Sequence, residues 1–152
     1  MKRSRREIVQ LAGAGIVGLG ALQGNDPPRK RFYKDPTGAS PTLGAIRSGH
    51  LLFVSGIGGW YPSRRPKPGD IREQTADALD LMKALLEAAG ASMADLLQVQ
   101  VALVDSDRTW EPMNEVYNAK VPEPRPVRSY FGTTGFATPG QLLQIDAIAY
   151  VE

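Results

Sequence analysis

The amino-acid sequence predicts an α+β domain in which two helices pack on one face of a mixed β-sheet. One long segment has apolar residues at the spacing of an amphipathic helix, and the segments around it alternate apolar and polar residues as strands do. The chain has 152 residues, 42% hydrophobic and 22% charged, which is an ordinary size and composition for one globular domain. The predicted order is strand, strand, helix, strand, helix, strand, strand.

Residues 43–56 predict two short strands around a turn at residues 48–50. Residues 60–70 (WYPSRRPKPGD) predict an irregular loop, because proline interrupts the hydrogen bonding of both helix and sheet. The histidine of the chain, His50, falls in the predicted turn, where a surface position is expected.

The first helix is predicted over residues 71–89, where the apolar side chains form a single stripe. Asp70 is a good N-cap, and Glu73 three residues later completes a capping box. Gly90 ends the helix. Since only one stripe is apolar, the helix is expected to cover a sheet with that stripe. A second, shorter helix is predicted from residue 109 to about residue 120.

Strict alternation predicts the later strands. In residues 91–105, the apolar side chains expected to face the helix are Leu97, Val99, Val101 and Leu103. In residues 142–151, the apolar face consists of Leu143, Ile145, Ala147 and Ala149, while Gln144 and Asp146 share the other face. Between these lies a strand at residues 127–132, in which Arg128 takes a position that normally goes to an apolar side chain.

The face of the sheet away from the helices is predicted to be partly polar. Its polar side chains are expected to be Gln98, Gln100, Arg128, Tyr130, Gln144 and Asp146. Such a face either contacts solvent or packs against copies of the same chain. Symmetric assembly would enclose these polar groups in clefts between subunits.

Residues 1–24 are predicted to be an export signal. The first six residues include four basic ones, and the mildly apolar run at 11–22 is too short to span a bilayer comfortably. The twin arginine in SRREIVQ resembles the signal of the twin-arginine pathway, which predicts an exported, periplasmic protein. A basic amphipathic helix is the alternative, although its glycines disfavour a helix. Residues 21–25 lack a clean A-x-A cleavage site, and an uncleaved leader would remain as a membrane anchor.

Residues 25–40 are predicted to be a linker and residues 41–152 the folded domain. Residues 1–24 contain 4 of the 18 basic residues and 1 of the 16 acidic ones, which leaves 14 basic and 15 acidic residues in the rest. A body without excess positive charge argues against nucleic acid as a partner. The basic patch at residues 29–34 lies in the predicted linker and is expected to be solvated.

The chain has no cysteine and one histidine. This composition excludes disulfides, thiol nucleophiles and thiolate metal sites, as well as the usual histidine-based metal clusters and catalytic triads. No metal site is predicted. The chemistry must therefore come from arginine, carboxylates, amides, hydroxyls and the backbone.

Five separated stretches of residues 41–152 closely resemble the Rid (YjgF) family of enamine/imine deaminases. They are AIRSGHLLFVSG, DIREQTADALDLMKALLEAAGASMADLLQVQVALVD, WEPMNEVYNAK, RPVRSYFGT and LQIDAIAYVE. The resemblance implies a chorismate mutase-like fold and a homotrimer with three clefts at its subunit interfaces. It also implies hydrolysis of reactive 2-imino acids, tautomers of enamines such as 2-aminoacrylate, to 2-oxo acids and ammonia. Neither a metal nor an organic cofactor is implied.

The same resemblance implies roles for individual residues. Arg128, in the P-x-R-S motif, is expected to hold the substrate carboxylate, because a planar guanidinium offers two parallel N–H donors to two oxygens. The alternative is an ion pair with an acid across the trimer interface. Asn114 is expected near the cleft, or else in packing or capping. Gly56 is expected to contact the substrate nitrogen or a water through its carbonyl, or else to form a tight bend.

Three positions depart from the family pattern. Gln144 replaces the glutamate that orients or activates water, and Asp146 on the same strand face is a possible partial substitute. Thr42 replaces a tyrosine, and Tyr130 replaces a small residue. The predicted catalytic residues are Arg128, Gln144 and Gly56, and the predicted substrate-binding residues are Arg128, Tyr130, Asn114 and Thr42.

Two other functions stay open at this stage. The first is a non-catalytic trimer that binds small carboxylates, which the change from glutamate to Gln144 and the export signal motivate. The second is ribonuclease activity, which requires a basic groove that the charge balance does not favour. The physiological 2-imino or 2-oxo acid is left undecided by the sequence.

Overall fold

The structure, a computed structural model, describes residues 30–38, 44–63 and 65–152. The predicted leader at residues 1–24, part of the predicted linker, and Thr42 lie outside the described residues. Within the described part of the chain, no helix has both the length and the apolar composition needed to cross a membrane.

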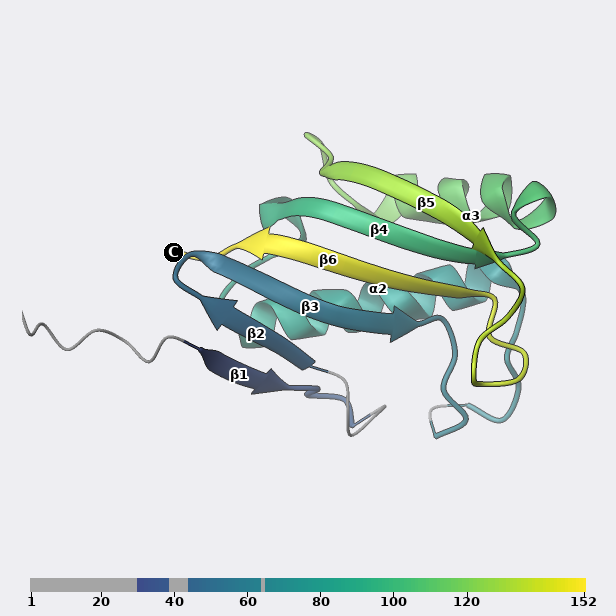
Figure 1. Cartoon of the computed structure of the whole chain (residues 1–152), viewed down its shortest axis with the longest axis horizontal. Helices are drawn as coiled ribbons and strands as arrows, with labels where there is room; N and C mark the ends of the chain where they lie inside the picture. The colour runs from purple at the N-terminus through teal and green to yellow at the C-terminus, as the bar shows by residue number, and fades with distance from the viewer. Residues whose placement is uncertain (1–29, 39–43, 64) are drawn as a thin grey trace, which may run out of the picture.

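A six-stranded mixed sheet forms one layer, and two helices lie together behind it (Figure 1). Its strand order is β1-β2-β3-β6-β4-β5, and all neighbours are antiparallel except the parallel pair β4 and β5. The strands are β1 (Arg31–Lys34), β2 (Gly44–Ser48), β3 (Leu51–Gly58), β4 (Leu96–Val104), β5 (Val127–Thr133) and β6 (Leu143–Tyr150). The helices are α2 (Ile71–Ala88) and α3 (Ser106–Lys120), with a short 3-10 turn at Met93–Asp95. The predicted α+β class is confirmed.

Strand β1 is an element that the predicted order lacks. It lies in the segment predicted to be a linker and pairs antiparallel with β2, so that Phe32 lies opposite Ile46. A strand of four residues is too short for alternation to reveal it. Its basic residues are typical of the edge of a sheet, where charged side chains discourage pairing with other chains.

The predicted ends of the first helix are close to those observed for α2. The side chain of Asp70 accepts a hydrogen bond from the Glu73 amide, and Glu73 Oε2 accepts one from the Asp70 amide, both at 2.9 Å. These two bonds satisfy amide groups that a helix otherwise leaves unpaired, which confirms the capping box. Gly90 follows the helix with φ of +83°, a left-handed conformation that glycine adopts without strain.

The core lies between the sheet and the two helices. Val99, Val101 and Leu103 on β4 are buried there as predicted, but Leu97 is 45% exposed and Leu96 is buried instead. The prediction for Leu97 is wrong because the pairing of β4 with β6 shifts between Leu96 and Gln98, which reverses the alternation at this end. On β6 the predicted apolar face is buried without such a shift.

Candidate functional site

Arg128 lies on the helix side of β5. The parallel register of β4 and β5 places Arg128 beside Val99 and Tyr130 beside Val101, and both valines are buried against the helices. We call the face of the sheet away from the helices the open face. The prediction that Arg128 and Tyr130 share this face with Gln100 and the other polar residues is therefore wrong. Alternation shows which residues of one strand lie together, but the face is set by the register with the neighbouring strand.

The Arg128 guanidinium lies against one stripe of α3. Its Cζ atom is 4.3 Å from the centroid of the Tyr117 ring and 5.0 Å from that of Trp110. Its Nη2 donates a 2.7 Å hydrogen bond to Oδ1 of Asn114. Trp110, Asn114 and Tyr117 are spaced by four and three residues, so they share one face of the helix. Two aromatic faces and one amide therefore surround the cation, an arrangement that cation–π attraction stabilises.

The charge of Arg128 is not balanced by a neighbouring acid. Among the described residues, no ion pair includes Arg128, and its hydrogen-bond partner Asn114 is neutral. Its Nη1 is buried and has no hydrogen-bond partner, and the same is true of the Tyr117 hydroxyl. Burial raises the pKa of Tyr117, and the positive charge of Arg128 acts in the opposite direction. The Tyr117 phenol therefore stays neutral and does not balance the positive charge of Arg128.

Tyr130 extends this aromatic surface along the strand. Its ring centroid is 4.0 Å from that of Trp110, with 31° between the two ring planes. Trp110 thus contacts both the guanidinium and the Tyr130 ring. Tyr130 is 51% exposed, so half of this large side chain has no cover in the single chain.

Gly56, Gln144 and Asp146 form a second group, on the open face of the sheet. A Cβ atom on Gly56 would lie 2.3 Å from Nε2 of Gln144 and 2.9 Å from Oδ1 of Asp146, so glycine leaves room for both side chains. The register of β3 with β6 shifts between Val54 and Ile57, next to this contact. Burial raises the pKa of Asp146, and a hydrogen bond with the Gln144 side chain partly opposes that change.

Asp146 also lines an open hollow of about 210 Å³ on this face. The lining residues are Phe53, Val54, Gln98, Gln100, Asp146, Ala147 and Ile148. Gln100 lies directly opposite Asp146 in the register of β4 and β6. Among these lining residues, Asp146 is the ionisable one, and Arg128 does not belong to the hollow.

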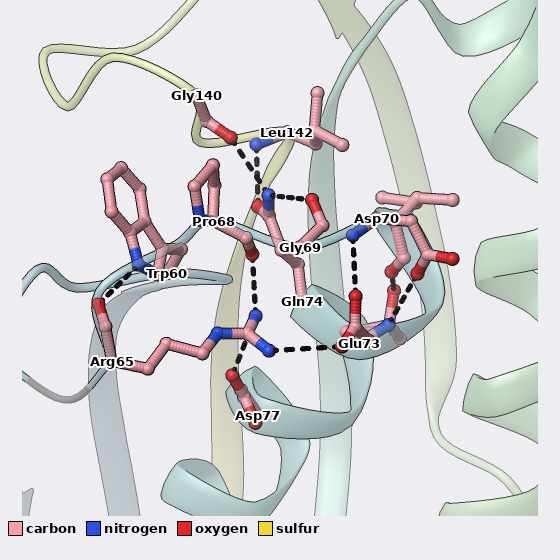
Figure 2. A network of polar contacts seen from close by, with 12 residues as sticks. Trp60, Arg65, Pro68, Gly69, Asp70, Glu73, Gln74, Asp77, Gly140 and Leu142 are labelled. Carbon is pink, nitrogen blue, oxygen red and sulfur yellow. Dashed lines mark hydrogen bonds and ion pairs between the residues drawn. The ribbon is translucent and has the colours of Figure 1, made fainter.

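The proline-rich loop at residues 60–70 packs against the segment that leads into β6 (Figure 2). Gln74, a fully buried residue of α2, bonds to both of them. Its Nε2 donates to the carbonyls of Gly140 at 2.8 Å and Gly69 at 3.3 Å, and its Oε1 accepts from the Leu142 amide at 2.8 Å. One amide side chain therefore joins the loop, the helix and the start of the strand that carries Gln144.

Arg65, itself a residue of the loop, also bonds the loop to α2, as Figure 2 shows. Its Nη2 donates to the Pro68 carbonyl at 2.6 Å and lies 3.0 Å from an oxygen of Asp77, and its Nη1 lies 3.6 Å from Glu73. The Trp60 indole donates to the Arg65 carbonyl at 3.2 Å. The loop is irregular as predicted, but it is bonded to α2.

Comparison with known proteins identifies the family. Residues 34–151 match the family model described as Endoribonuclease L-PSP. The chain belongs to this family. Solved structures similar to this chain are named YjgF family members and RidA, so the predicted family membership is confirmed.

Two of the relatives of this L-PSP protein described next are named as deaminases. A RutC family protein of Pyrococcus horikoshii is 36% identical over 118 residues, which cover 77% of this chain and 92% of the relative. The 3-aminoacrylate deaminase RutC of Acinetobacter baylyi is 30% identical over 120 residues, covering 76% and 91%. A 2-iminobutanoate/2-iminopropanoate deaminase of Dermatophagoides farinae is 27% identical over 118 residues, covering 77% and 91%.

Solved structures of the L-PSP family share the fold. A member of the YjgF/YER057c/UK114 family from Mycobacterium tuberculosis is 30% identical with a TM-score of 0.67, covering 80% of this chain and 99% of that one. The structure of Escherichia coli TdcF with bound serine is 27% identical with a TM-score of 0.64, covering 71% and 86%. These likenesses confirm the predicted fold.

In this L-PSP chain the predicted site residues fall into two groups. Arg128, Asn114 and Tyr130 lie together between β5 and α3, whereas Gly56 and Gln144 lie together on the open face. A single chain does not bring the two groups together. The sequence reasoning missed Trp110 and Tyr117. The four- and three-residue spacing of Trp110, Asn114 and Tyr117 could have indicated that these two aromatic residues share a helix face with Asn114.

Proposed function

We propose that this protein hydrolyses 2-imino acids, and the enamines that tautomerise to them, to 2-oxo acids and ammonia. The observation that carries the proposal is the uncompensated cation of Arg128, which is surrounded by aromatic rings and an amide. The deaminase names of the relatives from Acinetobacter baylyi and Dermatophagoides farinae support the same reaction class.

The chemistry of Arg128 suits a carboxylate. Its planar fork matches the two oxygens of a carboxylate, and Nη1 still has no acceptor. An unpaired buried donor costs about 1–3 kcal/mol, which a carboxylate oxygen on Nη1 would recover. Because Nη1 is buried in the single chain, we propose that the guanidinium rotates outward when the substrate binds.

The second group of residues belongs to the same reaction if copies of the chain assemble. Arg128 lies on the helix side of the sheet, whereas Gly56 and Gln144 lie on the open side. One cleft can therefore contain both groups only if two subunits contribute to it. We propose that this assembly is the homotrimer that the family resemblance implies. The open face favours assembly, because it exposes a row of apolar side chains that pair across β1, β2 and β3. They are Phe32, Ile46 and Phe53.

The proposed reaction needs orientation more than a strong base. Arg128 holds the carboxylate, and the Gly56 carbonyl and the Gln144 amide of a second subunit hold a water beside the carbon of the protonated imine. The water oxygen bonds to this carbon, the C=N double bond becomes single, and the proton lost by the water is transferred to nitrogen. The C–N bond then breaks, the hydroxyl oxygen releases its proton to solvent as the carbonyl forms, and ammonia leaves. Fixing both reactants supplies much of the catalysis, because protonated imines are already strong electrophiles.

The test is a trapping assay. 2-Iminobutanoate is generated in place by an amino-acid oxidase, and semicarbazide traps what the protein has not hydrolysed. We expect the protein to reduce trapping and Arg128→Ala to lower kcat/KM about 100-fold or more, since hydrogen bonds to charged groups contribute about 1.5–3 kcal/mol each. Arg108→Ala is the matched control, because its side chain is 84% exposed. Equal trapping with the protein and with Arg128→Ala would contradict the proposal.

Two other functions are less well supported. A carboxylate-binding protein without turnover would show a rise in melting temperature with a 2-oxo acid and release no ammonia from the imine. The family model's description names an endoribonuclease. A ribonuclease needs a row of basic side chains along a phosphate backbone, whereas the groups contacting Arg128 are two aromatic rings and an amide.

A further inference from the structure

We propose that Trp110 and Tyr130 form the subsite for the substrate's side chain and that the preferred substrates are 2-imino acids with an aromatic side chain. This inference rests on the proposed function and specifies its substrate class. It follows from three features of the helix side of β5: the exposure of Tyr130, the contact of Trp110 with both neighbours, and the spacing of Arg128 and Tyr130.

The first feature is an aromatic ring held in place but left open. Tyr130 is 51% exposed, and its ring lies 4.0 Å from the Trp110 ring, at an interplanar angle of 31°. The Trp110 contact limits the positions that the Tyr130 ring can take. A restrained, half-exposed ring can bind a flat apolar group with little loss of conformational entropy.

The second feature is that this ring surface is continuous with the cation. Trp110 lies 5.0 Å from Cζ of Arg128 on one side and contacts Tyr130 on the other. A ligand whose carboxylate reaches Arg128 therefore has an aromatic surface next to its remaining atoms. No polar group from the open face of the same subunit takes part in this surface, because Gln144 and Asp146 of that subunit lie on the other side of the sheet.

The third feature is the spacing along the strand. Arg128 and Tyr130 are two residues apart, and residues so placed are about 7 Å apart on the same face of a strand. In an aromatic 2-imino acid such as 2-imino-3-phenylpropanoate, the imine carbon and one methylene separate the carboxylate from the ring. Such a molecule can reach Arg128 and the Tyr130 ring together. A small aliphatic 2-imino acid reaches Arg128 but leaves most of the aromatic surface uncovered.

The experiment compares two substrates in one assay. Phenylalanine and 2-aminobutanoate are oxidised separately by an amino-acid oxidase, and semicarbazide trapping gives kcat/KM for each imino acid. We expect a preference for 2-imino-3-phenylpropanoate of about tenfold, because an aromatic pair contributes roughly 0.5–1.5 kcal/mol beyond the area it buries. Tyr130→Ser should lower kcat/KM for 2-imino-3-phenylpropanoate about tenfold more than kcat/KM for 2-iminobutanoate, so that the preference is lost. Tyr130→Phe keeps the ring and should keep the preference.

The other outcomes contradict the inference, and they distinguish a failure of the subsite from a failure of the proposed function. A wild-type preference for 2-iminobutanoate, or an equal loss of both activities in Tyr130→Ser, contradicts the aromatic subsite and leaves the proposed function standing. No turnover of either imino acid by the wild-type protein overturns the proposed function, and the subsite with it.

Discussion

Gly56 of β3 and Gln144 of β6 approach each other so closely that a methyl group on Gly56 would lie 2.3 Å from Nε2 of the Gln144 side chain. The same methyl group would lie 2.9 Å from Oδ1 of Asp146. The backbone of Gly56 does not have a positive φ, so the constraint on this position is space and not backbone conformation. The missing side chain is what allows an amide and a carboxylate to lie beside the end of β3.

Gly56→Ala is therefore expected to displace the Gln144 side chain. Contacts shorter than 3.0 Å force a shift, and overpacking of this kind costs about 1–3 kcal/mol. We expect a lower free energy of unfolding in urea and a lower kcat for imine hydrolysis, because the amide that we propose to position the water moves. A KM that changes little would locate the defect at the reacting carbon and not at the carboxylate.

The matched control is Gly135→Ala. A Cβ atom on Gly135 would meet nothing within 4 Å, and its φ is not positive. Its unfolding free energy should stay within about 0.5 kcal/mol of the wild-type value, as for most surface changes. If both variants lose the same stability and activity, the steric explanation for Gly56 is wrong.

Asn114→Leu is expected to destabilise the protein through Arg128. Leucine has nearly the shape of asparagine but cannot accept the 2.7 Å hydrogen bond from Nη2. Since Nη1 already lacks a partner, the guanidinium would lose the one side-chain acceptor that the structure gives it. We expect a loss of about 1–3 kcal/mol in urea unfolding. A double-mutant cycle with Arg128→Met isolates the bond, and additive losses would show that Asn114 acts by packing alone.

Asp146→Asn is expected to stabilise the protein at neutral pH. Burial raises the pKa of Asp146 above its ordinary value of 3.8, against the opposing effect of the Gln144 hydrogen bond. The folded state therefore favours the protonated carboxyl, and it loses stability as the pH rises from the ordinary Asp value through the raised value. Asparagine has no such charge and can still accept a hydrogen bond from Gln144.

The measurement is urea unfolding of both proteins at pH 7 and near pH 4, close to the ordinary pKa of an aspartate. The variant should be the more stable protein at pH 7, and the difference should shrink toward pH 4. The side chains that line the hollow on β3 and β4 carry no charge, so the pH dependence of the difference in unfolding free energy is not altered by another lining group. A variant that is less stable than the wild type at pH 7 would mean that the carboxylate is stabilised, not strained, in the folded protein.

The sequence predicted the parts of this fold that depend on neighbours along the chain. The capping box of Asp70 and Glu73 and the alternation of β6 are local, and both are observed. The position of Leu97 was wrong because a bulge changes the alternation, and the face of Arg128 was wrong because it depends on the register with β4. Both depend on pairing between distant strands, which periodicity within one strand does not determine.

The sequence also predicted only part of the candidate site. The family resemblance selected Arg128 and Asn114, and the structure places the two in direct contact. It also selected Gly56 and Gln144, which contact each other but lie on the far side of the sheet from Arg128. We propose that assembly joins the two groups, and the pattern of one chain does not reveal such an arrangement. Trp110 and Tyr117 had the spacing of a helix stripe, which by itself predicts packing and not a cation-binding surface.

Gln74→Ala is expected to loosen both the loop at residues 60–70 and the start of β6. The side chain is fully buried and bonds the carbonyls of Gly69 and Gly140 and the amide of Leu142 (Figure 2), so its removal leaves these backbone groups without partners. We expect a loss of roughly 2–4 kcal/mol in unfolding free energy, because each buried unsatisfied group costs about 1–3 kcal/mol. Hydrogen–deuterium exchange should accelerate at the Leu142 amide, and kcat should fall because Gln144 follows two residues later. Asn118→Ala removes an exposed amide from α3 and is the matched control. Unchanged exchange at Leu142 in Gln74→Ala would show that the loop and β6 are held by other contacts.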